Sequence, residues 1–382
     1  MTSPKTPTPQ RLLTDCLDLG ALLYDLRAES VFLVVDAIGY EASGALDILE
    51  PILSGRLSGR FDVNEPNPQW PGVLDCVRAM GEAAPGAVLA VGGGTAMDVA
   101  KLGNWLASQS AEAEVGLRNP PEQPEAAPPM IAVPTTAGSG SEATQFAVVY
   151  RDGEKHSVAH ANLRPAAAIV DPTLTANLPS DLTAHSGLDA LCQAIESIWS
   201  IHATEDSLAP AQAALALTWQ NLEAAVHEPT PAARSAMAWG AHLAGQAINL
   251  TQTTAPHALS YTLTSAFGIP HGAAVALTLG PVLGFNARVT EADCVDCRGP
   301  ESVQERLGII CETIGVNSSE HADAVFRQKV VAVGCPVTFS GTGIDGVDLI
   351  DRICNQVNPE RLANNPRRLT PASMRELLET IC

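Results

Sequence analysis

The chain has 382 residues, of which 46% are hydrophobic, and this supplies the cores of two domains of ordinary size. Its formal net charge of −20 argues against nucleic acid or an anionic membrane surface as a partner. No apolar run is long enough to cross a membrane, and the polar start MTSPKTPTPQ has no apolar signal core, so a cytoplasmic protein is expected. The nine cysteines are scattered, which is typical of reduced thiols, and the lone C-x-x-C at 294–297 lacks the second pair of a structural zinc site.

In the first half of the chain, short apolar and β-branched runs alternate with stretches at helical spacing. Four of these runs are predicted to be buried strands, at 30–36, 86–94, 128–136 and 166–172. Continuous apolar strands separated by helices predict a parallel sheet that is covered on both faces. A proline-rich surface connector is expected at 118–129.

The segment LAVGGGTAMDVAK has the order strand, glycine turn, helix. Glycines let the backbone approach a pyrophosphate, and the N–H groups at the start of a helix favour its negative charge. We therefore expect Gly93, Gly94, Thr95 and Asp98 to contact a nucleotide. Thr95 is predicted to cap the helix and Asp98 to lie in its first turn. An ordinary tight turn is the alternative for this motif taken alone.

Two further features at strand ends favour a dinucleotide site. Asp36 ends the first predicted strand, where a carboxylate can bond the adenosine ribose hydroxyls and repel a 2′-phosphate, so NAD is expected rather than NADP. The loop VPTTAGSGSEAT follows another strand and offers the hydroxyls of Thr135, Thr136 and Ser139.

From about Leu178 the composition changes to long Ala- and Leu-rich segments at helical spacing, such as 206–227 and 233–250. The sequence therefore predicts an α/β domain over residues 1–178 and a helical domain over residues 179–382.

Candidate metal ligands gather in this second half. Asp189 and Gln193 stand one helical turn apart in SGLDALCQAIES, so their side chains share a face. His257 and Tyr261 have the same spacing, and His271 follows a proline that resets the chain direction. A carboxylate and two imidazoles are a common set for Zn²⁺ or Fe²⁺, with an open position for a substrate oxygen. Spacing alone leaves open that these histidines are satisfied core residues.

The chain resembles the iron-containing, or group III metal-dependent, alcohol dehydrogenase superfamily from end to end. The matching stretches are PNP at 66–68, GGGTAMDVAK, PTTAGSGSEAT, IVDPTLTANLPSDLTAHSGLDALCQAIES and HALSYTLTSAFGIPHG. The resemblance implies an N-terminal Rossmann-like α/β domain and an all-α C-terminal domain, as in dehydroquinate synthase-like folds, with nucleotide and metal in the cleft between them. It adds Asn67, in the PNP stretch, to the expected cofactor contacts.

Residue by residue, the resemblance makes Asp189, His257 and His271 metal ligands. It places a further histidine ligand where this chain has Gln193, and a proton-relaying histidine where it has Tyr261. Glycerol dehydrogenases are similar in using one Asp and two His for zinc, so three ligands suffice, and the loss of an imidazole weakens Fe²⁺ more than Zn²⁺. We expect a modified site that holds zinc or, second, iron. A metal-free enzyme is the alternative.

Within the superfamily the chain most resembles phosphonoacetaldehyde reductases. This implies hydride transfer between NAD and a small polar alcohol or aldehyde in a biosynthetic pathway, with Tyr261 as the proton relay beside Gln193. A phosphonate needs charge-assisted donors. The best candidates in the sequence are Lys155 and Arg164, for which cofactor contacts or exposed loop charges are equally expected.

Other functions stay open at this point. One is a dehydrogenase of a ribosomal-peptide tailoring cluster, which oxidises a C-terminal Thr hydroxyl before decarboxylation. Another is a degenerate, non-catalytic nucleotide-binding homologue, and a third is a lyase that resembles dehydroquinate synthase. The resemblance also implies a homodimer or a larger homo-oligomer.

Overall fold

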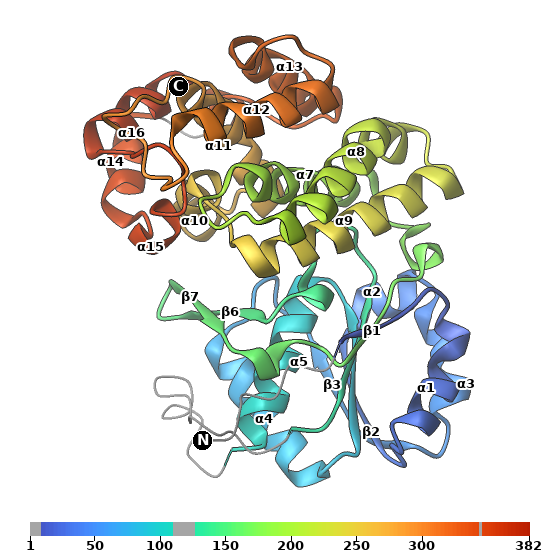
Figure 1. Cartoon of the computed structure of the whole chain (residues 1–382). Helices are drawn as coiled ribbons and strands as arrows, with labels where there is room; N and C mark the ends of the chain where they lie inside the picture. The colour runs from blue at the N-terminus through green and yellow to red at the C-terminus, as the bar shows by residue number, and fades with distance from the viewer. Residues whose placement is uncertain (1–8, 110–126, 344–345) are drawn as a thin grey trace, which may run out of the picture. The chain divides into compact units, whose positions relative to one another are not determined.

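The computed structural model describes residues 9–109, 127–343 and 346–382 (Figure 1). The chain divides into two compact units. The first holds Met1–Thr136 and Ser141–Leu178, and the second holds Ala137–Gly140 and Pro179–Cys382. Most of the proline-rich connector expected at 118–129, and of the polar start of the chain, lies outside the described residues.

The first unit is built around a parallel sheet, which has six strands in the described part of the chain, in the order β1-β8-β5-β4-β2-β3. The strands are β1 (Arg11–Leu13), β2 (Val31–Asp36), β3 (Leu57–Val63), β4 (Ala87–Gly92), β5 (Met130–Pro134) and β8 (Ala167–Ile169). The four strands predicted from apolar runs are β2, β4, β5 and β8, so the prediction of a parallel sheet is confirmed. The two edge strands, β1 and β3, were not predicted.

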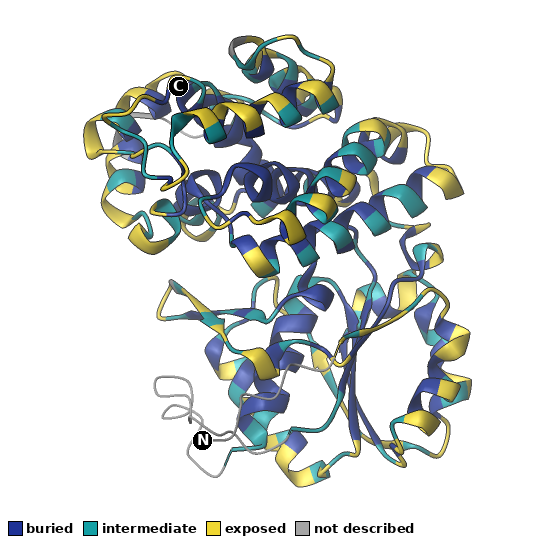
Figure 2. Cartoon of the chain, in the orientation of Figure 1, coloured by how far each residue is buried: buried dark blue, intermediate teal, exposed yellow. Residues whose placement is uncertain are grey.

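Helices cover both faces of this sheet. They are α1 (Leu19–Asp25), α2 (Ala37–Ala42), α3 (Ala45–Leu53), α4 (Trp70–Ala83) and α5 (Gly94–Ala107). Along β2, Leu33 and Val35 belong to the core that includes α1 and α3. Phe32 and Val34 belong to the other core, which includes α4 and α5. Successive side chains of a strand point to opposite faces, which explains why the central strands are apolar throughout and buried (Figure 2).

The second unit is helical over its described residues. Its helices are α7 (Ser180–Trp199), α8 (Glu205–His227), α9 (Pro231–Thr251), α10 (Ala255–Phe267), α11 (His271–Asn286), α12 (Pro300–Ile314), α13 (Ser319–Ala332), α14 (Gly346–Gln356), α15 (Pro359–Leu362) and α16 (Pro371–Glu379). The segments predicted at 206–227 and 233–250 are α8 and α9. Helix α7 packs against α8, α9, α11 and α12, and most of its residues are buried. The α/β fold followed by an all-α fold is therefore confirmed.

A short loop of the second unit, Ala137–Gly140, lies far from the rest of that unit in the sequence. Gly140 has a φ of 61°, and a Cβ atom added to it would lie 2.5 Å from the Cα atom of Gly245 in α9. A Cβ atom added to Gly138 would lie 2.7 Å from the Cβ atom of Ser186 in α7. The backbone of the loop therefore packs directly against α7 and α9, with no room for a side chain at either glycine.

In residues 9–109, 127–343 and 346–382, no helix combines the length and the apolar composition needed to cross a lipid bilayer.

Candidate active site

The carboxyl ends of β2 and β4 carry the expected nucleotide contacts of the first unit. After β2 the chain continues to β3 on one side, whereas after β4 it continues to β5 on the other side. Dinucleotides bind at such a reversal of strand order. Asp36 ends β2 and Gly92 ends β4, so these two residues flank the reversal.

The glycine turn after β4 is closely packed against its neighbours. A Cβ atom added to Gly92 would lie 2.8 Å from the Cβ atom of Ala96 and 3.0 Å from that of Asp36. A Cβ atom added to Gly93 would lie 3.4 Å from the side chain of Thr136. The backbone N–H of Thr135 donates to the carbonyl of Gly92 at 3.0 Å. The turn therefore meets Asp36, Thr135 and Thr136, and Gly92, which the sequence analysis did not single out, is essential to it.

The start of α5 differs from the prediction. Gly93 is the N-cap residue, in extended conformation (φ −83°, ψ −170°), so the expectation that Thr95 caps the helix is wrong. Thr95 instead follows Gly94 in the first turn. No side chain of the described residues caps this helix, and an uncapped helix start of this kind favours negative charge.

Asp98 was expected in the first turn of α5 but lies beyond it, and it is buried. Its two carboxylate oxygens accept hydrogen bonds from the Ser141 hydroxyl at 2.7 Å and from the Val148 N–H at 2.9 Å. Burial raises the pKa of Asp98, while the charges of Lys101 and, less strongly, Lys155 lower it. Asp98 thus holds the antiparallel hairpin of β6 (Phe146–Arg151) and β7 (Glu154–Ala159) against α5.

The other expected cofactor residues lie as follows. Asp36 is half-buried and accepts a hydrogen bond from the Gly39 N–H at 3.2 Å, which caps α2. Asn67 lines a cavity of about 180 Å³ at the end of β3, together with Asp62. Lys155 lies on β7. Ser139 belongs to the loop of the second unit.

Asp189, His257 and His271 converge within the second unit. The Nε2 atom of His257 lies 3.2 Å from Oδ1 of Asp189, and that of His271 lies 4.0 Å from the same oxygen. One ligand atom of each residue lies within 4.8 Å of the others, and no second group of this kind occurs among the described residues. The ligands of a tetrahedral ion with bonds of about 2.0–2.2 Å stand roughly 3.5 Å apart. The donor set and its spacing therefore fit one divalent cation with an open coordination position.

The link between α10 and α11 explains how the two histidines meet. Helix α10 ends at Phe267 and is followed by Gly268, which has a φ of 70°, and α11 begins at His271 after Pro270. A Cβ atom added to Gly272 would lie 1.8 Å from the carbonyl oxygen of His185 in α7. Because only glycine permits this approach, the start of α11 lies directly on α7, near Asp189.

A buried carboxylate that the sequence analysis missed orients His257. Glu196 is fully buried, and its Oε1 accepts hydrogen bonds from Thr254, at 2.8 Å from the N–H and 2.9 Å from the hydroxyl. Its Oε2 accepts from Nδ1 of His257, which leaves Nε2 on the side of Asp189. A carboxylate behind a histidine ligand is the usual second layer of a metal site. The only signal in the sequence is that Glu196 lies two helical turns after Asp189, on the same face of α7.

The charge balance around His257 also fits a cation. Burial lowers the pKa of His257, but Glu196 and Asp189 outweigh burial and raise it to about 9. Two carboxylates thus face one imidazole in a buried setting, where unpaired negative charge is costly. A divalent cation at Nε2 would balance both carboxylates.

Gln193 lies one turn after Asp189 and is buried. Its Nε2 donates weakly to the carbonyl of Ser139, at 3.4 Å, whereas Oε1 has no hydrogen-bond partner among the described residues. Buried carbonyl oxygens are rarely left unpaired. Gln193 therefore offers a neutral oxygen on the helix face that carries Asp189.

Tyr261 lies one turn after His257 on α10. Burial raises the pKa of Tyr261, and hydrogen bonds to Thr253 and Arg361 oppose that rise. Arg361, on α15, was not singled out in the sequence analysis, because nothing local marks a residue so far downstream. Lys155 and Arg164, the cations proposed for a phosphonate, both belong to the first unit.

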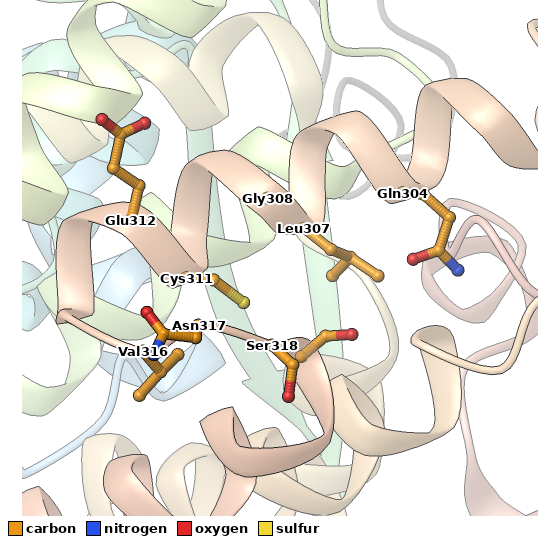
Figure 3. Close-up of a pocket in the computed structure, with 9 residues that line it drawn as sticks. Gln304, Leu307, Gly308, Cys311, Glu312, Val316, Asn317 and Ser318 are labelled. Atoms are coloured by element: carbon orange, nitrogen blue, oxygen red, sulfur yellow. The ribbon is translucent and has the colours of Figure 1, made fainter.

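A cavity beside α12 is unrelated to these residues. It has a volume of about 330 Å³ and is lined by α12 and the start of α13, with Cys311, Glu312 and Ser318 among its residues (Figure 3). Burial raises the pKa of the Cys311 thiol, so the cavity offers no reactive thiolate. None of the three candidate metal ligands lines it.

Comparisons with known proteins identify the family. A family model described as iron-containing alcohol dehydrogenase matches residues 12–172, and one for the C-terminal part of the same family matches residues 183–382. The phosphonoacetaldehyde reductase of Streptomyces viridochromogenes is 36% identical over 300 residues, which cover 76% of this chain and 74% of that protein. The long-chain-alcohol dehydrogenase 1 of Geobacillus thermodenitrificans is 34% identical over 304 residues, with the same two shares covered, 76% and 74%.

A solved structure is similar over the whole chain. Sulfoacetaldehyde reductase from Bifidobacterium kashiwanohense, in complex with NAD⁺, has a TM-score of 0.86 at 27% identity, covering 100% of this chain and 98% of that one. These relatives are alcohol dehydrogenases and aldehyde reductases. They give no support to the peptide-tailoring function or to a non-catalytic homologue.

Proposed function

The chain belongs to the iron-containing alcohol dehydrogenase family and is an oxidoreductase acting on CH–OH groups, and we propose that it reduces a small aldehyde bearing an anionic group. The observation that supports this substrate class is that two relatives are named for chemically similar substrates. Their names specify phosphonoacetaldehyde and sulfoacetaldehyde, which are both two-carbon aldehydes with an anionic head. The family description and the NAD⁺ in the related structure support a nicotinamide cofactor and a divalent metal for this chain.

The proposed metal ligands are Asp189, His257 and His271, with Glu196 fixing the ring of His257. When bound, the metal polarises the substrate oxygen and the nicotinamide supplies the hydride. We propose zinc rather than iron, because Gln193 offers an amide oxygen in place of an imidazole. Gln193 would contact either the cation or the substrate hydroxyl through Oε1.

Tyr261 is the proposed proton donor. Because its pKa is raised by burial, the phenol keeps its proton at neutral pH and can donate it to the oxygen that the hydride transfer leaves negative. The balance is one aldehyde, one NADH and one proton, which give one alcohol and one NAD⁺. In the reverse direction the same residue would have to lose its proton first.

The proposed NAD contacts are the first N–H groups of α5 for the pyrophosphate and Asp36 for the adenosine ribose. Gly93, Gly94, Thr95, Asn67, Thr135, Thr136, Ser139 and Lys155 complete the set proposed from the sequence. Asp98 is proposed to act indirectly, by holding the β6–β7 hairpin on the helix that carries the glycine turn.

Steady-state NADH oxidation tests the proposal. With phosphonoacetaldehyde, sulfoacetaldehyde and propionaldehyde as substrates, we expect kcat/KM for at least one anionic aldehyde to exceed that for propionaldehyde by about tenfold or more, the effect of roughly 1.4 kcal/mol of added transition-state binding. A preference for propionaldehyde would reject the substrate class. The absence of NADH oxidation with all three aldehydes would also reject this substrate class.

The zinc, the homo-oligomeric state, the cytoplasmic location and the place in a biosynthetic pathway remain proposals from the sequence. Elemental analysis of the purified protein checks the first of these, and light scattering after size-exclusion chromatography checks the second.

A further inference from the structure

A buried threonine at the start of α10 uses its hydroxyl in an unusual way. Thr254 is the N-cap residue of α10, but its side chain makes no cap bond to that helix. Threonines that begin other helices do cap them: Thr204 accepts from the third N–H of α8, Thr230 from that of α9 and Thr370 from that of α16. Because a threonine at this position normally caps its own helix, the hydroxyl of Thr254 is expected to have another role.

The hydroxyl of Thr254 bonds to two side chains of α7 instead. It donates to Oε1 of Glu196 at 2.9 Å and accepts from Nε1 of Trp199 at 2.8 Å. Glu196 and Trp199 stand one helical turn apart, and all three residues are fully buried. A buried indole N–H requires an acceptor, and Thr254 supplies it while its own proton points to Glu196. The indole therefore fixes the direction in which the hydroxyl donates.

The two oxygens of Glu196 have different partners. Oε1 accepts from the N–H of Thr254 at 2.8 Å, from its hydroxyl and, more weakly, from the N–H of His257 at 3.4 Å. Oε2 accepts from Nδ1 of His257. The last torsion of a glutamate side chain is broad, so staggering alone fixes the carboxylate plane poorly. The donors on Oε1 therefore set this plane and, with it, the position of Oε2.

The position of Oε2 decides how the ring of His257 lies. When Nδ1 donates to Oε2, Nε2 carries the lone pair that can bind a cation. Nε2 lies 3.2 Å from Oδ1 of Asp189, which is another of the candidate ligands. A rotation of the carboxylate plane would turn the ring and shift Nε2 relative to Asp189. The bonds of Thr254 thus affect the candidate metal site although Thr254 is not one of its ligands.

We propose that Thr254 and Trp199 are positioning residues of the metal site. Through Glu196 they hold the ring of His257 in the orientation that binds the cation, so the hydroxyl of Thr254 helps to set the metal affinity. This inference rests on the metal site of the proposed function and extends it to two residues outside the ligand set. Removing the hydroxyl leaves Glu196 with its backbone donors but loosens its plane, and it removes the acceptor of the Trp199 indole.

Zn²⁺ binding to the metal-free protein, measured by competition with a chelator, tests the proposal. Thr254→Val keeps the size and branching of the side chain but removes the hydroxyl. We expect its affinity for Zn²⁺ to fall about tenfold, the lower end of the range for changes behind a metal ligand. Thr254→Ser restores the hydroxyl and should bind Zn²⁺ as the wild type does. Trp199→Phe removes the indole N–H and should lower the affinity less, by about two- to fivefold, since a neutral hydrogen bond is lost one contact further away.

Thr218→Val is the matched control. Thr218 is also fully buried, but its hydroxyl donates to the carbonyls of Ala214 and Leu215 in its own helix, so the affinity for Zn²⁺ should not change. Thermal unfolding is measured for every variant, and Thr254→Ala replaces Thr254→Val if that variant does not fold. Wild-type affinity in Thr254→Val, or a loss that Thr254→Ser does not restore, would overturn the proposal. An equal loss in Thr218→Val would assign the effect to packing and would also overturn it.

A double-variant cycle shows whether Thr254 acts through Glu196. If it does, the loss of Zn²⁺ affinity in the protein that carries both Glu196→Gln and Thr254→Val should be smaller than the product of the two single losses. A loss equal to that product would mean that the two residues act independently, and Thr254 would then not be a positioning residue for Glu196.

A measurement without metal separates this inference from the proposed function. In protein with isotope-labelled histidine, the Nδ1 proton of His257 is assigned by the loss of its resonance in His257→Gln. Its exchange with solvent, which reports the bond to Glu196, should be about tenfold faster in Thr254→Val and unchanged in Thr254→Ser. If the wild type binds no Zn²⁺, the metal site of the proposed function fails, and the exchange rate still decides whether Thr254 positions His257. Equal exchange rates in the wild type and in Thr254→Val would overturn that role.

Discussion

The two candidate sites are built from different parts of the polypeptide. The nucleotide edge of the first unit is formed by backbone at the ends of neighbouring strands, where Gly92 leaves no space for a side chain. The ligand cluster of the second unit is formed by side chains of α7, α10 and α11, of which Asp189 and His257 are buried. Changes to the first site should therefore alter the affinity for the cofactor and the preference between NAD and NADP. Changes to the second site should abolish metal binding and catalysis.

The largest effect is expected from Asp189→Ala. This removes the only carboxylate among the three metal ligands, so the protein should lose its metal and kcat/KM should fall by about 1,000-fold or more, as expected when several kcal/mol of charge stabilisation are lost. Elemental analysis and NADH oxidation check it. Asp181→Ala, at an exposed position of the same helix, is the control. Unchanged metal content in Asp189→Ala would contradict the ligand assignment.

Tyr261→Phe should lower kcat by about 100-fold or more, the usual contribution of a general acid. The affinity for NAD should not change. Because the pKa of Tyr261 is raised, aldehyde reduction by the wild type should not decline through loss of this proton until the pH exceeds about 10, the ordinary value for tyrosine. The control is Tyr24→Phe, at an exposed residue. A variant with wild-type kcat from pH 6 to pH 10 would show that the phenol only packs.

Glu196→Gln tests the layer behind the ligands. The substitution keeps the size of the side chain but removes the charge that faces Nδ1 of His257. Second-layer changes of this kind weaken metal binding by about 10- to 100-fold, which competition with a chelator measures. Glu205→Gln, at the exposed start of α8, should leave metal binding unchanged. Equal metal affinity in the wild type and in Glu196→Gln would mean that Glu196 only holds the start of α10 in place.

The smallest effect is expected at the nucleotide edge. Asp36→Asn can still accept the hydrogen bond that caps α2 but loses the charge that would repel a 2′-phosphate. The ratio of kcat/KM for NADH to that for NADPH should fall by about tenfold, that is, by roughly 1.4 kcal/mol, and Asp36→Gly should behave similarly. A wild-type enzyme that prefers NADPH would refute the role given to Asp36.

The same contrast explains what could be predicted from the sequence. The sheet follows from contiguous apolar runs, and the glycine turn follows the run at 86–94. Contiguous patterns of this kind are visible in one sequence. The edge strand β3 was missed because its residues are largely exposed and carry no continuous apolar signal. The role of Asp98 was missed because its partners, Ser141 and Val148, come from a hairpin that only the tertiary fold brings to α5.

In the second unit, Asp189, His257 and His271 were expected to act together, and the structure brings them together. Glu196 was missed although it lies in the same helix as Asp189, because a buried glutamate has the same local sequence signal as an exposed one. Arg361 depends on the packing of α15 against α10 and has no local signal at all. Residues that support a site from a distance are thus the least visible in the sequence.

The loop Ala137–Gly140 has a consequence for the exchange of halves between relatives. The helical unit includes this loop, which is encoded well before the rest of that unit. A chimera joined at residues 178 and 179 would combine the loop of one parent with the helices of another, and Gly140 would then have to meet a foreign counterpart of Gly245. Successful recombinants should therefore retain glycine at both positions, or transfer residues 137–140 together with the helices.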